Sequence, residues 1–123
     1  MDAKRILVVD DDEDLLKMLK MRLEAEGYEF MCAKDGNEML KVVEVKKPDV
    51  ILLDIMLPNM DGYSALREMR NKEDLKEIPV IVLSAKQKKK LGDLFALEKI
   101  AFFIEKPFEP SDLLQKIKIV VNG

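Results

Sequence analysis

The sequence of 123 residues contains no histidine and only one cysteine, Cys32. The absence of histidine excludes catalytic triads, histidine general bases and histidine-ligated zinc. A single cysteine cannot form a disulfide within the chain, so a reducing compartment is favoured. Because Cys32 has apolar neighbours, we expect it to be a small core residue. Any chemistry must therefore use carboxylates, a lysine or a hydroxyl.

Long apolar runs are also missing. No stretch of 18 apolar residues occurs, and residues 1–5 lead into a short strand-like run rather than a signal peptide. Net charge is −3, with 37% charged residues of both signs, so nothing points to nucleic acid as a direct partner. Hydrophobic residues make up 48% of the chain, enough for a core. We expect a single domain over residues 1–123, in the cytoplasm and without contact with a membrane.

Five short apolar runs alternate with amphipathic segments of helical periodicity. This alternation is typical of an α/β fold in which a parallel sheet is doubly wound by crossover helices. The runs that predict strands are residues 6–9, 28–33, 50–53, 78–83 and 101–104. The segments that predict five helices follow Asp12, the Asp35-Gly36-Asn37 turn, Gly62, Lys86 (to about residue 97) and Glu109, with Gly27 ending the first.

The third apolar run, residues 50–53, stops abruptly at Asp54, and Pro58 and Gly62 follow as turn signals. An apolar run bounded in this way predicts a strand buried on both faces. Asp54 would then lie at the carboxyl end of that strand, where open α/β sheets bind ligands. Taken alone, this stretch is equally compatible with Asp54 as an ordinary turn residue.

Polar residues follow the other predicted strands in the same way. Asp10 and Asp11 end the first strand, Ser84 ends the fourth, and Lys106 comes shortly after the fifth. Parallel strands place all of these ends, and that of Asp54, at one edge of the sheet. Carboxylates within about 4–6 Å of one another repel unless a cation neutralises them. A hard divalent ion with oxygen ligands, Mg²⁺ for preference, is therefore expected.

A carboxylate beside Mg²⁺, a lysine and a hydroxyl is suited to receive a phosphoryl group. Asp54 is the best nucleophile because its strand is central, while the metal and Lys106 neutralise the transferred oxygens and Ser84 donates a hydrogen bond. Asp12, Glu13 and Asp14 are better explained as the cap and first turn of a helix.

Four motifs together resemble the receiver domain of two-component response regulators, with its chemotaxis-protein-like fold, over essentially the whole chain. They are ILVVDDD at 6–12, LDIMLPNMDG at 53–62, VIVLSAK at 80–86 and FIEKPF at 103–108. The resemblance implies a flavodoxin-like sheet of five parallel strands in the order 2-1-3-4-5, flanked by five helices. It also implies a phosphoprotein of phosphorelay signal transduction.

The resemblance implies roles for the site residues. Asp54 would accept phosphate from the phosphohistidine of a histidine kinase or phosphotransfer domain. Asp11 and Asp54 would bind Mg²⁺ directly, Asp10 would act through water, and the backbone carbonyl of Met56 would be a further ligand. No catalysis is expected beyond self-phosphotransfer and autodephosphorylation at Asp54. Met56 is bulky and cannot orient water, so we expect the phosphoryl-aspartate to hydrolyse slowly.

The same resemblance implies how the signal leaves the domain. Ser84 matches the switch hydroxyl and Phe103 the aromatic switch position, although Phe103 also suits a core strand residue. The peptide bond between Lys106 and Pro107 is expected to be cis. Phosphorylation would change the face of the fourth helix, fifth strand and fifth helix, which an effector protein or a second copy of the chain would bind.

Two other functions remain open from the sequence. The site could be vestigial in a constitutive binding module, although its residue set is complete. The chain could also be a phosphohydrolase with an Asp nucleophile. Such an enzyme usually needs an acid/base carboxylate two residues after the nucleophile, where this chain has Met56.

Overall fold

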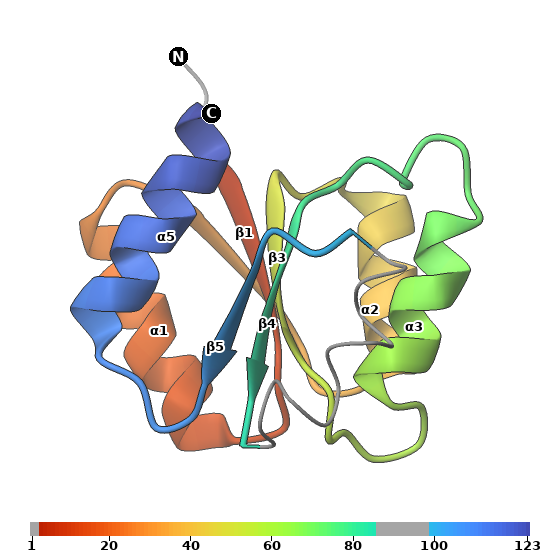
Figure 1. Cartoon of the computed structure of the whole chain (residues 1–123), viewed down its shortest axis with the longest axis horizontal. Coiled ribbons are helices and arrows are strands. Elements are labelled where there is room, and N and C mark those ends of the chain that lie inside the picture. The colour runs from red at the N-terminus through yellow and green to blue at the C-terminus, as the bar shows by residue number, and fades with distance from the viewer. Residues whose placement is uncertain (1–2, 86–98) are drawn as a thin grey trace.

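The computed structural model of the protein describes residues 3–85 and 99–123. In that part of the chain the backbone forms five strands and four helices (Figure 1). The strands are β1 (Arg5–Val9), β2 (Glu29–Ala33), β3 (Val50–Asp54), β4 (Val80–Ser84) and β5 (Phe102–Glu105). The helices are α1 (Glu13–Ala25), α2 (Gly36–Val45), α3 (Gly62–Arg70) and α5 (Pro110–Asn122). The further helix predicted at residues 86–97 lies outside the described residues.

The strands form one parallel sheet in the order β2-β1-β3-β4-β5, which confirms the predicted topology. The register pairs Val9 of β1 with Leu53 of β3, and Asp54 of β3 with Leu83 of β4. The residues that follow β1 therefore lie beside the end of β3. All five carboxyl ends meet at one edge of the sheet, as the sequence predicted.

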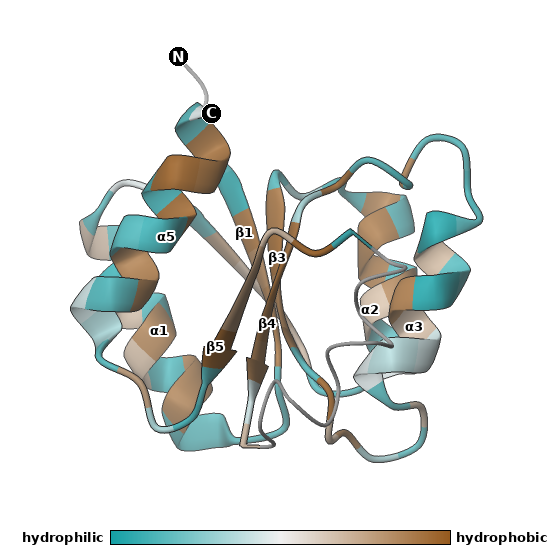
Figure 2. Ribbon diagram, viewed as in Figure 1, coloured by the Kyte–Doolittle hydropathy of each residue, from teal (hydrophilic) through white to brown (hydrophobic). Residues whose placement is uncertain are grey.

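Apolar layers cover both faces of the sheet. Helices α1 and α5 lie on one face and α2 and α3 on the other (Figure 1). Alternate residues of the central strand serve the two layers, since Leu52 packs on the α1/α5 side and Leu53 on the α2/α3 side. The neighbouring strands β3 and β4 are buried along their whole length, and most of their residues are hydrophobic (Figure 2). Each fully buried Leu or Ile contributes about 1.5–3 kcal/mol, so these strands are a rigid base for the groups at their ends.

Short-range signals in the sequence set the helix ends. Helices α1, α2 and α3 each begin after an aspartate whose side chain accepts a hydrogen bond from a backbone N–H of the first turn. These caps are Asp12, Asp35 and Asp61. Helix α5 begins at Pro110, where the missing N–H costs nothing. Gly27 ends α1 with a left-handed φ of 87°.

Some strand bounds and the burial of one residue differ from the sequence prediction. Strand β4 begins at Val80 rather than Ile78, and β5 runs one residue later than expected. The prediction that Cys32 is a core residue is wrong, because its side chain is exposed. Cys32 pairs with Val8 but belongs to β2, the edge strand, in which only Ala33 is fully buried. Among the described residues, no helix is both long enough and apolar enough to cross a membrane.

Candidate functional site

Two carboxylates follow β1 and differ in burial. Asp10 is only 1% exposed, and its backbone N–H donates to the carbonyl of Ala33 at 3.0 Å. Its Oδ1 accepts from the backbone N–H of Asp12 at 3.0 Å, which turns the chain into α1. Asp11 between them is exposed. The loop therefore holds one carboxylate inside the site and presents the next one to solvent.

Asp54 is the last residue of β3 and its side chain is buried. Its Oδ1 accepts a hydrogen bond from the backbone N–H of Met56 at 3.2 Å. The chain then folds back so closely that a Cβ at Gly62 would lie 2.2 Å from the carbonyl oxygen of Asp54. Only glycine permits this approach. The tight return places the start of α3 against the backbone carbonyl of Asp54.

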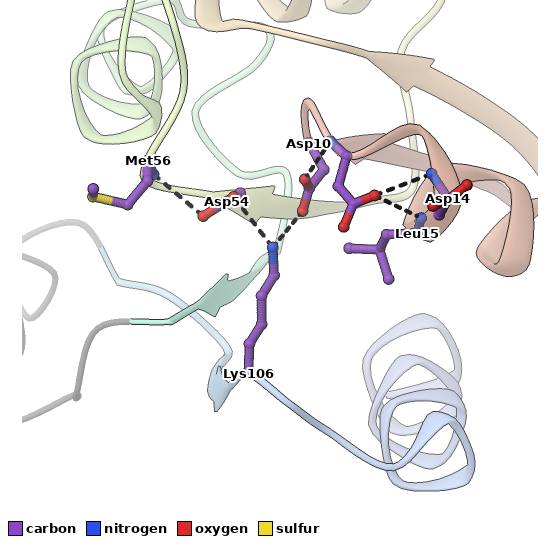
Figure 3. Close-up of polar contacts among 7 residues, drawn as sticks. Asp10, Asp14, Leu15, Asp54, Met56 and Lys106 are labelled. Carbon is purple, nitrogen blue, oxygen red and sulfur yellow. Dashed lines mark hydrogen bonds and ion pairs between the residues drawn. The ribbon is translucent and has the colours of Figure 1, made fainter.

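Lys106 closes the site from the side of β5. Its backbone N–H donates to the carbonyl of Ser84 at 2.8 Å, and the peptide bond to Pro107 is cis, as predicted. Its Nζ lies 2.7 Å from Oδ2 of Asp10 and 3.2 Å from Oδ2 of Asp54 (Figure 3). One ammonium group thus bridges two buried carboxylates that come from different strands.

Burial and charge oppose each other in this cluster. Burial raises the pKa of Asp54, attraction to Lys106 lowers it, and repulsion by Asp10 raises it; the net shift is upward from 3.8. For Lys106, burial lowers the pKa, but hydrogen bonds and attraction from Asp10 and Asp54 outweigh it, so the net shift is also upward. The ionised Asp54 is therefore costly to hold in this site without a further cation.

The carboxylates are close enough to share a metal ion. Asp10, Asp11 and Asp54 each offer one oxygen, and these three atoms lie within 4.8 Å of one another. Oxygen donors with this density of negative charge suit a hard divalent cation such as Mg²⁺. The predicted convergence of Asp10, Asp11, Asp54 and Lys106 is therefore present in the structure.

The other predicted residues lie around this cluster. Ser84 is fully buried at the end of β4, one residue beyond Leu83, the register partner of Asp54. Phe103 of β5 is half-buried and packs on the α2/α3 side of the sheet. Met56 has a side chain 55% exposed, directly after Asp54 and Ile55. The roles assigned to these three residues remain predictions.

Sequence reasoning missed a contact that supports the site. Asp35, which had been assigned only to a turn, accepts a hydrogen bond from the side chain of Asn59 at 2.8 Å. Asn59 has a left-handed φ of 64° in the loop after Asp54. An asparagine between Pro58 and Gly62 is a usable signal for such a backbone. Its partner 24 residues away is visible only in the folded chain.

Comparison with known proteins gives a consistent match. Residues 6–118 match the sequence model of the family described as response regulator receiver domain. A CheY-like receiver domain protein from Methanospirillum hungatei JF-1 is 32% identical, with a TM-score of 0.91 over 98% of this chain and 95% of that one. The chemotaxis protein CheY4 of Vibrio cholerae is 27% identical, with a TM-score of 0.90 over 97% and 99%.

A third similar structure contains a metal ion. It is the receiver domain of a sensor histidine kinase from Pseudomonas aeruginosa PAO1, with magnesium coordinated in its active site cleft. That domain is 27% identical to this chain, with a TM-score of 0.89 over 99% of this chain and 100% of its own.

Proposed function

Because this chain belongs to the response regulator receiver family of two-component systems, we propose that it is a signalling switch which accepts a phosphoryl group on Asp54. The observation that carries the proposal is the contact of Lys106 Nζ with both Asp10 and Asp54. Such a cluster keeps a nucleophilic carboxylate next to a cation that can also meet the incoming anion.

The proposed reaction is transfer from a phosphohistidine. A carboxylate oxygen of Asp54 attacks the phosphorus, the phosphorus–nitrogen bond breaks, and its electron pair stays on the imidazole nitrogen of the kinase or phosphotransfer domain. The product is an acyl phosphate on Asp54. Lys106 is placed to stabilise the negative oxygens, because its Nζ already lies 3.2 Å from Oδ2 of Asp54. Hydrolysis then ends the cycle: water attacks the phosphorus, the bond to the Asp54 oxygen breaks, and inorganic phosphate and the free carboxylate are the products. The chain therefore turns over only the phosphoryl group that it carries.

The donor set fits Mg²⁺. We assign Asp11 and Asp54 as direct ligands, the backbone carbonyl of Met56 as a further one, and Asp10 as a residue acting through water. Three carboxylate oxygens within 4.8 Å support this assignment, as does the magnesium in the similar Pseudomonas receiver domain. When bound, Mg²⁺ would supply neutralising charge for the phosphoryl oxygens. Asp11 places a negative charge on the side of the site that faces solvent. On the inner side, the charge of Asp10 is neutralised by its ion pair with Lys106.

Phosphorylation adds about two negative charges at a buried position. We assign Ser84 and Lys106 to bind the new oxygens and Phe103 to respond on β5. Ser84 ends β4, Lys106 follows β5 and Phe103 lies within β5, which makes the face around β5 and α5 the proposed output surface. The helix predicted at 86–97, which would complete that face, lies outside the described residues. The proposed reader is an effector protein or a second copy of the chain.

Labelling with a small phosphodonor tests the proposal. Acetyl phosphate and Mg²⁺ should give about one phosphate per chain, none in Asp54→Asn, and none after removal of the metal. Asp61→Asn is a matched control, because it removes another carboxylate of the same loop while an amide still caps α3. Continuous turnover of phosphodonor would favour a phosphohydrolase. Absence of labelling in the unaltered chain would favour a vestigial binding module.

A further inference from the structure

The loop between β2 and α2 contains none of the proposed site residues. It contacts the loop after β3, residues 55–61, which contains Met56. Asp35 in the loop between β2 and α2 is a buried carboxylate with both oxygens engaged. Its Oδ1 accepts from the backbone N–H of Glu38 at 2.8 Å and caps α2, and its Oδ2 accepts from the side-chain amide of Asn59 at 2.8 Å. One side chain therefore joins the start of α2 to the loop after β3.

A second contact at the neighbouring residue reinforces the first. The backbone N–H of Gly36 donates to the carbonyl of Met60 at 2.9 Å. A Cβ at Gly36 would lie 2.7 Å from that carbonyl oxygen and 2.8 Å from Cγ of Met60. Two consecutive residues, the cap and the first residue of α2, thus contact two consecutive residues of the loop after β3. Glycine is required because the two backbones touch.

The loop that these two contacts fix, residues 55–61, contains the groups that set the geometry around Asp54. The N–H of Met56 donates to Oδ1 of Asp54, and its carbonyl is the proposed metal ligand. The Ile55 carbonyl accepts from Leu57 at 3.1 Å and from Gly62 at 3.0 Å, so these bonds close the loop on itself. They set its local shape, whereas Asp35 and Gly36 set its position relative to the rest of the sheet.

We propose that Asp35 and Asn59 are positioning residues for the phosphoryl-acceptor site: their hydrogen bond fixes the 55–61 loop so that the Met56 carbonyl and the Asp54 carboxylate face the same metal ion. This inference rests on the proposed function. Groups that orient metal ligands without touching the metal commonly change its affinity by about 10–100-fold when removed. A bond one step further from the ligand, as here, belongs at the low end of that range.

The chain offers a contrast on the other side of the same loop. Lys34, next to Asp35, pairs with Glu13 of α1 at 2.6 Å, but these side chains are 50% and 66% exposed. Exposed ion pairs contribute little, because solvent screens them and both side chains lose conformational freedom. Lys34→Ala therefore removes a neighbouring tether that should have no effect on the site.

The decisive variants remove the bond from its two ends while keeping the backbone. Asn59→Gly deletes the amide, and glycine adopts the left-handed φ of this position without strain. Asp35→Ser keeps a cap for α2 but is too short to reach Asn59. Asp35→Asn is the conservative variant, because it still caps and Asn59 can rotate its amide to accept a hydrogen bond. If one of the disruptive variants fails to fold, the other still decides the question.

The measurement is the Kd for Mg²⁺, from calorimetry or from the amide resonances of Asp54 and Met56, with the rate of labelling by acetyl phosphate as a second readout. Asn59→Gly and Asp35→Ser should each weaken Mg²⁺ binding about ten-fold. The double variant should bind Mg²⁺ as tightly as the single variant with the higher Kd, because both changes remove the same hydrogen bond. Asp35→Asn and Lys34→Ala should stay within about two-fold of the unaltered chain. A merely structural role would lower Tm without moving Kd.

Two failures can be told apart. If the unaltered chain is labelled on Asp54 but Asn59→Gly and Asp35→Ser bind Mg²⁺ as tightly as it does, only the positioning role is overturned. Additive losses in the double variant overturn it as well, since they place the two residues in separate interactions. If the unaltered chain is never labelled, the proposed function fails, and the Mg²⁺ affinities still decide whether the Asp35–Asn59 bond orders the metal site.

Discussion

Lys106 Nζ lies 2.7 Å from Oδ2 of Asp10, a carboxylate that is only 1% exposed. The lysine comes from the loop after β5 and the aspartate from the loop after β1, which β3 and β4 separate in the sheet. The lysine side chain thus crosses the carboxyl ends of β3 and β4, where its Nζ lies 3.2 Å from Oδ2 of Asp54. Without bound metal, this contact is the main compensation for two buried negative charges.

Removal of the lysine should therefore destabilise the metal-free protein. We expect Lys106→Met to lower the free energy of unfolding by about 2 kcal/mol at pH 7, or roughly 8 °C in Tm, because it leaves two buried carboxylates without a cation. The loss should shrink at acidic pH, where Asp54 protonates. At pH 7, Mg²⁺ should stabilise the variant more than it stabilises the unaltered chain. Thermal unfolding across pH, with and without Mg²⁺, measures all three effects.

Lys76→Met is the control for that experiment. Lys76 pairs with Glu73 at 3.0 Å, but the two side chains are 42% and 90% exposed, so the change should cost less than about 0.5 kcal/mol. Equal losses in Lys106→Met and Lys76→Met would mean that the buried contacts of Lys106 carry no special weight.

Asp54→Asn should stabilise the metal-free protein at neutral pH. The folded protein holds the pKa of Asp54 above 3.8, chiefly through burial. The fold therefore favours the protonated acid: this contribution to stability is present below the ordinary pKa and lost as pH rises through the higher folded value. An amide at this position carries no charge and avoids this loss. Asp54→Asn should therefore raise the free energy of unfolding by about 1 kcal/mol, or Tm by a few degrees, at pH 7.

The pH dependence is what tests this explanation. The difference in Tm between Asp54→Asn and the unaltered chain should narrow as pH falls below the folded pKa of Asp54, because both then carry an uncharged group there. A difference that stays constant from pH 7 to pH 3, or an amide variant that is less stable at pH 7, contradicts the assignment of burial as the dominant cause.

Asp11 should matter for the metal and not for the fold. Its side chain is exposed, so Asp11→Asn should leave the free energy of unfolding of the metal-free protein unchanged within about 0.5 kcal/mol. At ten times the Kd, Mg²⁺ should stabilise the unaltered chain by about 1.4 kcal/mol, and Asp11→Asn should lose most of this gain. Asp14→Asn, an exposed acid in the first turn of α1, is the matched control. Equal stabilisation by Mg²⁺ in both variants would remove Asp11 from the ligand set.

The parts of the site that were predictable from sequence are those that depend on strand ends. An apolar run in the sequence predicts a buried strand, and the residue at which the run ends can be identified without knowing the conformation of the loop that follows. Parallel strands bring such residues to one edge whatever their separation in sequence. Asp10, Asp54 and Lys106 could therefore be grouped correctly before any contact was known, although Asp10 and Lys106 are 96 positions apart in sequence.

The parts that were not predictable depend on loop conformation or on the position of a strand in the sheet. The sequence predicts Asp35 only as part of a turn before a helix, whereas in the structure it caps α2 with one oxygen and accepts from Asn59, a residue with a left-handed backbone, with the other. Cys32 reads as a core residue because its neighbours are apolar. Its exposure follows from the place of β2 at the edge of the sheet, which an apolar pattern cannot reveal.

Met56 should make the phosphorylated state long-lived. Its side chain is 55% exposed beside the acceptor and offers no group that can hold a water molecule against the phosphorus. We expect a half-life of minutes or longer after labelling with acetyl phosphate and removal of the donor. Met56→Asn should shorten it by about ten-fold, because an amide there can orient a water. Met21→Asn, at an exposed methionine on α1, should leave the half-life unchanged. A half-life of seconds in the unaltered chain refutes the prediction, because water would then reach the phosphorus unhindered past the thioether.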